Sequence, residues 1–406
     1  MSTQTYTLKL YTSVLRIPRE EWNSLTTEDT IPFLDWEWMA ALEASGSVSP
    51  ETEWQPLHIT LWDKTRLKAA APFYLRTSSR GEYVYDYFWA EAAASLSRPW
   101  YPKLVGMVPA TPAEGYRFLV APGEDEAAIT RIILQAAEDL CRKNGICGLH
   151  ILFADPAWGG NLENRGYAAW EHSSFLWENE GFAAFDDYLE CFDKNQRRNI
   201  KREYGGPGKE GVTVQVVSGL EAPEEYFYRM FELFTLTNDK FFPWDARFVN
   251  EDFFLRLEKN FRKNIAFVEA RYGGEMEGLA ALAFLVRKGK RLWGRYWGAY
   301  EDIKDLHFAA CYYAPIEWAI KEGIRFFDPG AGSPHKIRRG FRLVSGKSYH
   351  KFFDPVLEKL FTSNIDAVND YERENIEELN AQLPFKRNLE EKSYNGEFPR
   401  LKDQGK

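Results

Sequence analysis

One segment of the sequence combines residue types that suit the binding of a negatively charged group. A short apolar run, Ile324–Phe327, leads into Asp328, then into the glycines Gly330 and Gly332, and then into the cations Lys336, Arg338 and Arg339. Glycine admits positive φ and a close approach of backbone N–H groups to a ligand. Successive amides in such a turn form a concavity for anions. The pattern predicts an anion site at the end of a strand; the alternative is an ordinary turn with solvated cations.

A second group of cations lies upstream. Five of them fall within nine residues, namely Lys194, Arg197, Arg198, Lys201 and Arg202. At helical spacing, residues three and four apart are neighbours, so these side chains are predicted to share one broad face. Such a face suits the phosphates of a nucleotide-linked acceptor or of a tRNA 3′ end. A solvated helix face is the alternative.

Aromatic and basic residues between these two groups are candidates for a substrate cleft. On the predicted strand Trp293–Trp297 one face must pack in the core, and Arg295 and Trp297 are the candidates for the other. His307 begins a predicted helix, where it serves either as a base or as a structural cap. Lys240 and Trp244 lie in an aromatic loop that is predicted to cover the cleft.

Composition restricts the class of protein. With 406 residues the chain is expected to form two domains. Its net charge of −9 excludes the electrostatic pattern of a general nucleic-acid binder, so a polyanion must be met locally. The first residues lack a signal-peptide pattern, and no apolar run reaches the ~18 residues of a membrane span. We therefore expect a cytoplasmic protein.

Cysteine and histidine usage gives no sign of a metal centre. The 4 cysteines and 6 histidines follow no metal-ligand or redox spacing. Reduced, buried thiols are expected, and no metal site and no bound cofactor are predicted.

Two stretches of the sequence repeat the same order of predicted strands. The first has strands at Leu57–Leu61, Ala69–Leu75 and Tyr83–Ala90, and the second has them at Ile265–Ala270, Leu279–Leu285 and Leu292–Gly298. Turn residues separate the strands, so each set is predicted to form a three-stranded antiparallel meander.

A helix and a further strand follow each meander. The helices are predicted over Glu126–Asn144 and Phe308–Glu322, and each is followed by a glycine, the usual helix stop. Strands are then predicted at Leu149–Phe153 and Arg325–Phe327. The repeat predicts an α+β fold with two domains, residues 1–172 and 173–406, each a mixed, mainly antiparallel central sheet flanked by helices. A helical tail is expected to end the second.

Several longer motifs carry a family resemblance. They are Gly81–Asp86 and Tyr101–Leu104 in the first half, and Arg197–Glu203, Gly294–Gly298, His307–Tyr313 and His335–Phe341 in the second. With the internal duplication, they resemble the FemAB-like, GNAT-superfamily N-acyltransferases, and more closely the family of bacterial peptidoglycan biosynthesis/recognition proteins. The resemblance implies two tandem GNAT-like domains and the transfer of an aminoacyl or acyl group to an amine, for instance on a peptidoglycan precursor.

The resemblance also suggests roles for particular residues. It implies that Lys336 and Arg339 place positive charge where a tetrahedral acyl intermediate becomes negative. Asp328 is the third candidate catalytic residue, either positioning the amine, acting as a weak base like Asp86, or capping the turn. Substrate binding is expected of a larger set: Arg197, Arg198, Lys201, Lys240, Arg295, Trp297, His307, Gly330, Gly332 and His335.

The sequence differs from that of acetyl-CoA-using GNAT enzymes in one loop, and this difference bears on the identity of the acyl donor. Acetyl-CoA-using GNAT enzymes carry a [QR]-x-x-G-x-[GA] loop that binds pyrophosphate at a helix N-terminus. No such loop precedes either predicted helix. This favours an aminoacyl-tRNA end or another activated acyl group over acyl-CoA as co-substrate. Two alternatives stay open: a non-catalytic protein that recognises a cell-wall precursor or nucleotide-linked ligand, and a CoA-dependent acetyltransferase.

Overall fold

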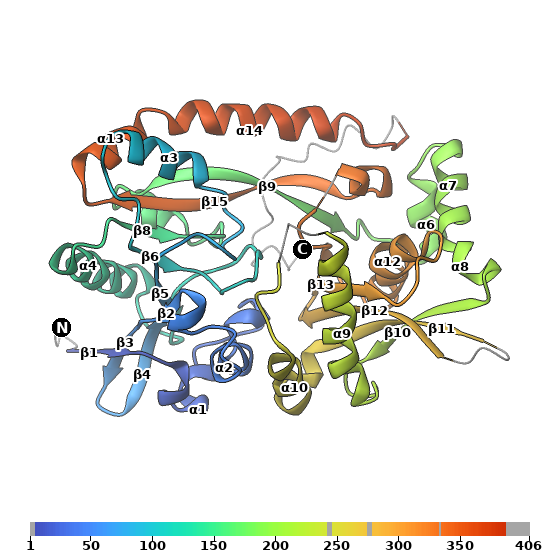
Figure 1. The fold of residues 1–406 in the computed structure, drawn as a ribbon, viewed down its shortest axis with the longest axis horizontal. Helices are drawn as coiled ribbons and strands as arrows, with labels where there is room; N and C mark the ends of the chain where they lie inside the picture. Colours follow the sequence, from blue (N-terminus) through green and yellow to red (C-terminus); the bar gives the residue numbers. More distant parts are fainter. Residues whose placement is uncertain (1–4, 242–245, 274–277, 333, 387–406) are drawn as a thin grey trace. The chain divides into compact units, whose positions relative to one another are not determined.

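The computed structural model describes residues 5–241, 246–273, 278–332 and 334–386. They divide into two compact units (Figure 1). The described residues of the first unit are 5–172 and 345–374, and those of the second lie within 173–344 and 375–386. The chain therefore leaves the first unit, returns to it late, and enters the second again. None of the helices in these ranges combines the length and the apolarity that a membrane span requires.

The first unit contains two sheets and several helices. Its strands are β1 (Thr7–Tyr11), β2 (Trp54–Pro56), β3 (His58–Asp63), β4 (Arg66–Ala71), β5 (Phe73–Arg76), β6 (Lys103–Gly106), β7 (Leu119–Val120), β8 (Gly148–Ile151) and the later part of β15 (Arg342–Phe352). Its helices are α1 (Arg19–Asn23), α2 (Trp36–Ala44), α3 (Tyr87–Ser95), α4 (Glu126–Asn144), α5 (Gly160–Glu163), α13 (Pro355–Thr362) and the first part of α14 (Ile365–Asn380).

Strand pairing in this unit is mixed. One sheet has the order β1-β3-β4-β7, and in the other β15, β8, β6, β5 and β2 are successive neighbours. Only the β6–β8 pair is parallel among these pairings. Helix α4 forms the crossover between β6 and β8, and it begins and ends at the predicted residues. Asp125 accepts a hydrogen bond from the Ala128 N–H at its start, and Gly145 ends it with φ +65°.

The first predicted meander is wrong in two places. Tyr83–Ala90 was predicted as a strand, yet Tyr87–Ser95 forms helix α3. The aromatic residues favour a strand locally, but the alanines that follow are strong helix formers. In addition, Ala69–Leu75 is interrupted at Pro72, so β4 and β5 belong to different sheets. Proline has no N–H to donate to a strand ladder, which makes it a natural break.

A network of charged side chains is buried in the first unit. Arg76, Glu82, Asp86 and Lys103 are each at most 3% exposed. The Lys103 ammonium donates to Ser79 Oγ at 2.7 Å, to Glu82 Oε2 at 2.7 Å and to Asp86 Oδ2 at 2.6 Å. All three of its protons are therefore used within the protein.

The same network fixes the state of Asp86. Burial alone would raise its pKa, but the Lys103 charge and the hydrogen bonds from Lys103 and Trp100 outweigh burial and hold the pKa below its usual value. The Trp100 indole N–H donates to Asp86 Oδ2 at 2.8 Å. Asp86 is thus an ionised carboxylate paired with lysine. This is the environment of a structural ion pair rather than that of a base.

A pair of histidines joins β8 to β15. The Nδ1 atoms of His150 and His350 lie 2.7 Å apart, and both rings are buried. Burial lowers the pKa of His350 to about 3 and lowers the pKa of His150 as well. Both imidazoles are therefore neutral at pH 7, and one donates to the other.

The second unit has a single sheet in the described residues. Its strands are the later part of β9 (Ala168–Glu178), β10 (Val212–Ser218), β11 (Ile265–Tyr272), β12 (Gly278–Lys288), β13 (Arg291–Ala299) and β14 (Phe326–Asp328). Its helices are α6 (Phe185–Glu190), α7 (Lys194–Tyr204), α8 (Gly206–Lys209), α9 (Glu225–Lys240), α10 (Glu251–Asn260), α11 (Leu306–Phe308), α12 (Ala314–Lys321) and the end of α14.

The predicted meander of this unit is confirmed. Strands β11, β12 and β13 are consecutive antiparallel neighbours, and β14 then pairs with β13 in parallel. The helical segment before β14 forms the crossover, as α4 does in the first unit. Gly323 ends that segment with φ +66°. Each unit thus contains a strand, a helix and a parallel strand in the same order, and this is the basis of the duplication.

Helix α9 lies across β12 and β13, and one glycine permits this packing (Figure 1). A Cβ added at Gly298 would overlap the backbone carbonyl of Leu233 in α9. Replacing Gly298 by alanine is expected to destabilise the protein by about 1–3 kcal/mol, because a backbone carbonyl cannot move aside cheaply. Urea denaturation measures the effect. Gly278→Ala in β12 is the control, since its Cβ would meet no atom within 4 Å; equal effects would contradict the prediction.

Candidate active site in the second unit

The predicted anion loop follows β14 directly. Gly330 has φ +81° and Gly332 has φ +142°, which are backbone conformations that favour glycine. A Cβ on Gly330 would lie 3.0 Å from the carbonyl oxygen of Gly294. The residues from Pro334 to Arg339 then form a short 3₁₀ turn that carries the cations. The two glycines thus let the loop fold tightly against β13.

Lys336 is buried, and its ammonium holds the loop. Its side chain is 2% exposed, and Nζ donates to the carbonyl oxygens of Gly330 at 2.6 Å and Ala331 at 2.9 Å. The same nitrogen lies 5.0 Å from the centre of the Phe175 ring. Burial lowers the pKa of Lys336 to about 8. The lysine is therefore charged at pH 7, but it loses its proton far more easily than an ordinary lysine.

Arg339 is also buried, and both of its terminal nitrogens donate within the protein. Its guanidinium lies 3.4 Å from the centre of the Phe308 ring. Nη1 donates to the His335 carbonyl at 2.8 Å, and Nη2 forms an ion pair with Glu203 at 2.8 Å. The Tyr313 hydroxyl donates to the same Glu203 oxygen at 2.5 Å. The buried Nε has no hydrogen-bond partner among the described residues, so the guanidinium keeps an unused charged donor there.

Two histidines lie beside this arginine. The ring centres of His307 and His335 are 6.0 Å apart, and Phe308 lies within 5.6 Å of both. Burial is the main cause that lowers the pKa of each histidine to about 4. Both imidazoles are therefore neutral at pH 7, and the lowered pKa makes each of them a weak base. The Tyr312 hydroxyl is 2.9 Å from His335 Nε2 and orients that ring.

The helix that carries these tyrosines contains a wide turn. Residues Ala309–Tyr313 form a π-helical turn between α11 and α12, where the sequence predicts one regular helix from Phe308 to Glu322. Such turns are frequent at functional sites. Pro315 is the signal that could have revealed it, because proline cannot donate the helical bond to the carbonyl of Cys311. The wide turn points Tyr312 at His335 and Tyr313 at Glu203.

Asp328 and Arg295 fix the start of the loop. Asp328 Oδ1 accepts a hydrogen bond from the Gly330 N–H at 2.7 Å, and Oδ2 pairs with Arg295 Nη2 at 3.3 Å. Arg295 also donates to the Gly294 carbonyl at 3.0 Å. Both Asp328 oxygens thus have partners within the protein. Of the roles considered for Asp328, this geometry suits the turn cap.

Helix α7 has two faces with different contacts. On one face Gln196 donates to the Arg338 carbonyl at 2.5 Å, and Glu203 binds Arg339. With 3.6 residues per turn, the five cations occupy the opposite face; they are Lys194, Arg197, Arg198, Lys201 and Arg202. Arg197 is half-buried and the other four are exposed. Lys201 makes only a loose surface pair with Asp186 at 3.4 Å. The structure therefore does not bring Arg197, Arg198 and Lys201 together with Lys336 and Arg339.

Of the remaining candidates for substrate binding, one lies in the cluster around Arg339 and one does not. The Trp297 ring lies 5.5 Å from His307, so this tryptophan belongs to the cluster. Lys240 is the exposed last residue of α9 and makes no hydrogen bond or ion pair with a described residue. Trp244, the other residue of the predicted cover, lies outside the described residues.

Three residues of the cluster have no predicted role. Glu203 holds Arg339, Tyr312 contacts His335, and Phe308 packs under the guanidinium. All three lie in motifs that carry the family resemblance, Arg197–Glu203 and His307–Tyr313. The sequence does not indicate which of these residues pair. Glu203 and Arg339, for example, are more than a hundred residues apart in the chain.

Comparisons with known proteins show what this chain is similar to. The crystal structure of FemX is similar, with a TM-score of 0.52 and 11% identity over 88% of this chain and 100% of FemX. L-PGS from Bacillus licheniformis has a TM-score of 0.47 and 11% identity over 80% of this chain and 95% of its own. A tandem GNAT protein from the clavulanic acid biosynthesis pathway has a TM-score of 0.43 and 12% identity over 86% and 99% of the two chains. No curated protein matches the sequence.

The fold is thus the predicted α+β arrangement, with mixed sheets flanked by helices, and it is similar to the fold of FemX. The sequence also matches a family model directly. That model is the FemAB-like family, described as peptidoglycan biosynthesis/recognition, and the match covers residues 13–387. The chain belongs to the FemAB-like family.

Proposed function

We propose that this protein is an N-acyltransferase that moves an aminoacyl or acyl group from an activated donor to an amine, such as one on a peptidoglycan precursor. The observation that carries the proposal is the cluster of the second unit. There, two neutral imidazoles, His307 and His335, lie beside the buried cations Arg339 and Lys336. Acyl transfer needs both a proton acceptor and positive charge near the carbonyl oxygen.

In the proposed acyl transfer, the two cations and the imidazoles have different roles. The acceptor amine attacks the carbonyl carbon of an ester or thioester, so that a C–N bond forms and the carbonyl oxygen becomes negative. The free Nε–H of Arg339 and the charge of Lys336 stabilise that oxygen. One imidazole accepts the amine proton, and this proton then passes to the leaving oxygen or sulfur as its bond to carbon breaks. No metal or redox group takes part in this scheme.

The starts of the crossover helices bear on the donor. Asp125 caps α4 and Asp305 precedes α11. The Asp125 carboxylate accepts the Ala128 N–H and so occupies the position at the start of α4 where a pyrophosphate would bind, whereas the Asp305 side chain makes no such cap bond. This supports an aminoacyl-tRNA end over acyl-CoA as the co-substrate of the proposed reaction. With such a donor the reaction would take place in the cytoplasm, where aminoacyl-tRNA is made.

Transfer can be tested directly. The protein is incubated with aminoacyl-tRNA, acyl-CoA or nucleotide-linked ligands together with amine acceptors, and the mixtures are analysed by mass spectrometry. A product heavier by the acyl group, formed in proportion to enzyme, supports the proposal. Saturable binding of a cell-wall precursor or nucleotide-linked ligand without turnover for any donor would favour the non-catalytic recognition protein instead.

The lowered pKa of Lys336 predicts an unusual pH dependence. Below pH 8 the ammonium is charged and stabilises the oxyanion, and above pH 8 it is neutral. We expect wild-type kcat/KM to exceed that of Lys336→Met by about 100-fold at pH 6.5. The ratio should fall as the pH rises through 8, whereas an ordinary lysine would keep it constant to about pH 10. Taking the ratio of the two kcat/KM values removes the effect of the ionisation of the acceptor amine, because that effect is the same for both enzymes.

The exposed Lys304 provides the control for this measurement. Lys304→Met should leave kcat/KM close to that of the wild type at every pH. A ratio for Lys336→Met that stays flat between pH 6.5 and 9.5 would show that the charge of Lys336 does not act on the reaction.

A further inference from the structure

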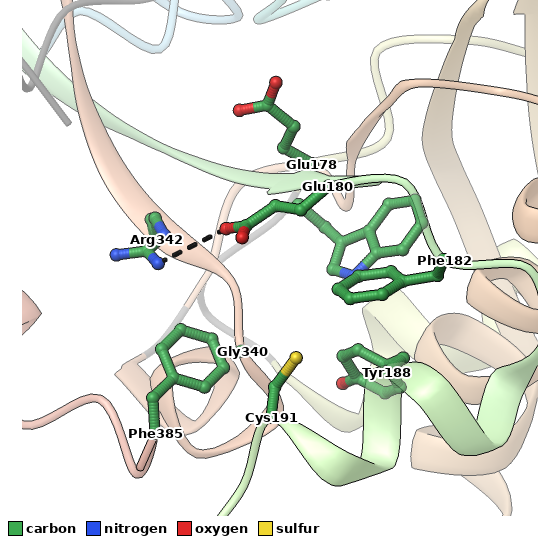
Figure 2. A pocket seen from close by; sticks show the side chains of 9 residues that line it. Glu178, Glu180, Phe182, Tyr188, Cys191, Gly340, Arg342 and Phe385 are labelled. Atoms are coloured by element: carbon green, nitrogen blue, oxygen red, sulfur yellow. Dashed lines mark ion pairs between the residues drawn. The ribbon is translucent and has the colours of Figure 1, made fainter. Parts of the chain in front are cut away.

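Helix α6 borders a small recess and a large groove. The recess is shown in Figure 2, where Glu180 forms an ion pair with Arg342 at 3.5 Å, and the Arg342 guanidinium lies 5.0 Å from the centre of the Phe385 ring. It has about 20 Å³ of accessible space, room for about one water molecule, so its own side chains fill it. The groove has about 520 Å³, a volume typical of sites for small molecules.

The groove has an apolar, partly aromatic surface. Its lining comes from three helices and includes Phe185, Asp186 and Leu189 of α6, Lys201 and Tyr204 of α7, and Glu317 of α12. The centres of the Phe185 and Tyr204 rings are 5.3 Å apart, and the rings meet at 57°. Leu189 is buried. These side chains offer a surface on which a flat heterocyclic ring can stack.

One edge of the groove is strongly cationic. With 3.6 residues per turn, Arg197, Lys201 and Tyr204 lie along the same side of α7. The other cations of this helix follow on its outer face; they are Lys194, Arg198 and Arg202. Arg197 is half-buried, yet neither it nor the three outer cations form an ion pair with a described residue. The groove is therefore bordered by positive charge that the described part of the chain leaves uncompensated.

The two carboxylates of the lining do not cancel this charge. Asp186 pairs with Lys201 at 3.4 Å, and both side chains are exposed, at 80% and 59%. Exposed pairs of this kind contribute little free energy, so Lys201 stays available to a ligand. Glu317 accepts a hydrogen bond from the Tyr204 hydroxyl. Two carboxylates thus stand against the five cations of α7, in a protein whose net charge is −9. The excess is local and suits a phosphate.

We infer that this groove binds a nucleoside phosphate, with its base against Phe185 and Tyr204 and its phosphate beside Arg197 and Lys201. The aromatic surface accounts for the base, and the uncompensated cations account for the phosphate. A free nucleotide and the single-stranded end of an RNA share this chemistry, and the experiment below distinguishes them. The inference does not rest on the proposed acyl transfer, because binding can be measured without turnover.

The groove lies outside the candidate active site but next to the residues that hold Arg339. The ring centres of Tyr204 and Tyr313 are 5.7 Å apart. The Tyr313 hydroxyl donates to Glu203, which pairs with Arg339. A nucleotide in the groove would therefore contact the same helix that positions Arg339, on a different side of that helix.

Binding is measured by titration calorimetry with the full-length protein. The probes are ADP and UDP, since stacking tolerates any base, together with adenosine, which lacks the phosphates, and pyrophosphate, which lacks the base. We expect saturable binding of a nucleotide and at least about tenfold weaker binding of adenosine and of pyrophosphate. Hexaadenylate serves as the RNA probe. Binding of hexaadenylate about tenfold tighter than that of ADP identifies an RNA end as the ligand, and equal or weaker binding identifies a free nucleotide.

Four substitutions and one control locate the site. Arg197→Gln and Lys201→Gln should each weaken ADP binding by about five- to tenfold, because a charged contact with phosphate is lost. Phe185→Leu should weaken it by about tenfold through the loss of a stacking ring. Asp186→Asn should tighten it by about threefold, because Lys201 is freed from its acidic neighbour. Lys209→Gln is the control, since Lys209 is exposed at the end of α8 and does not line the groove.

The opposite effects of two of these changes make the test decisive. Weaker binding by Lys201→Gln together with tighter binding by Asp186→Asn supports the inference, and partial unfolding cannot produce this pattern, because it weakens both. Pyrophosphate that binds as tightly as ADP would show that α7 recognises charge alone, and adenosine that binds as tightly would show that the cations take no part. Either result overturns the inference, as does the absence of saturable binding of both nucleotides and of hexaadenylate.

Discussion

Replacing Arg339 by glutamine is expected to lower kcat/KM for acyl transfer by about 100- to 1,000-fold. The substitution removes a buried charge and the only guanidinium nitrogen of Arg339 that has no partner in the described residues. Glutamine keeps a polar amide at the level of Nε but lacks the charge and the two terminal nitrogens, so the loss reports on the whole guanidinium. Initial rates with saturating donor and varied amine measure it.

The neighbouring residue supplies a matched control. Arg338 is exposed, and its backbone carbonyl rather than its side chain is bound by Gln196. Arg338→Gln should therefore change kcat/KM by less than about twofold, since surface substitutions away from a site have small effects. Equal losses in the two variants would show that this stretch acts through its total charge, and the role proposed for Arg339 would be wrong.

The folding of Arg339→Gln must be checked separately, because the change also leaves Glu203 without its cation. Arg339→Lys serves this purpose, since it retains a charge for Glu203 but loses the planar fork that stacks on Phe308. If Arg339→Lys melts near the wild-type temperature and still loses most of its activity, then the geometry of the guanidinium, rather than stability, accounts for the loss.

Replacing Lys103 by methionine is expected to cost about 3–5 kcal/mol of unfolding free energy. The lysine is the shared cation of Glu82 and Asp86, and its ammonium lies within 2.7 Å of both carboxylates. Methionine has a similar volume, so little packing changes. Two buried carboxylates would then face each other without a positive charge nearby, apart from Arg76 beside Glu82. Urea denaturation followed by circular dichroism measures the change.

Lys143→Met is the control for this prediction. Lys143 is exposed in the last turn of α4 and should lose less than about 0.5 kcal/mol. A loss below about 1 kcal/mol for Lys103→Met would mean that the two carboxylates take up protons at little cost, and the network would not be a major source of stability.

Elements whose signals are local could be predicted from the sequence. Helix α4 has a capping aspartate, a buried apolar stripe and a glycine that ends it, and its bounds agree with the prediction. The meander β11–β13 has alternating apolar residues and short polar turns, and it forms as expected. In both cases the residues that decide the structure lie within the element.

Elements that depend on distant partners could not be predicted in this way. Tyr83–Ala90 has strand-like composition, yet the helix α3 that begins at Tyr87 takes its place. Asp86, just before α3, is bound by Lys103 and Trp100. The predicted strand Ala69–Leu75 ran through Pro72, and nothing local indicates that β4 and β5 pair in different sheets.

The candidate site shows the same division. The sequence indicates which loop carries the glycines and cations, because these residues follow one another within a short stretch of the chain. It does not indicate that Lys336 donates two hydrogen bonds to the carbonyl oxygens of Gly330 and Ala331, or that Glu203 pairs with Arg339. Nor does the spacing of the α7 cations reveal that their face is opposite the one that holds the loop.

The late return of the chain to the first unit has a consequence for synthesis on the ribosome. Strand β8 pairs with β6 on one side, and on the other with residues 349–352 of β15, where His150 meets His350. Domains generally fold in the order in which they emerge, but the first unit lacks this strand until residues 349–352 have been translated. Until then β8 is an unpaired edge, the kind of surface on which nascent chains aggregate. A fragment that stops at residue 172 should therefore need a chaperone, or the missing strand supplied as a peptide, to remain in solution.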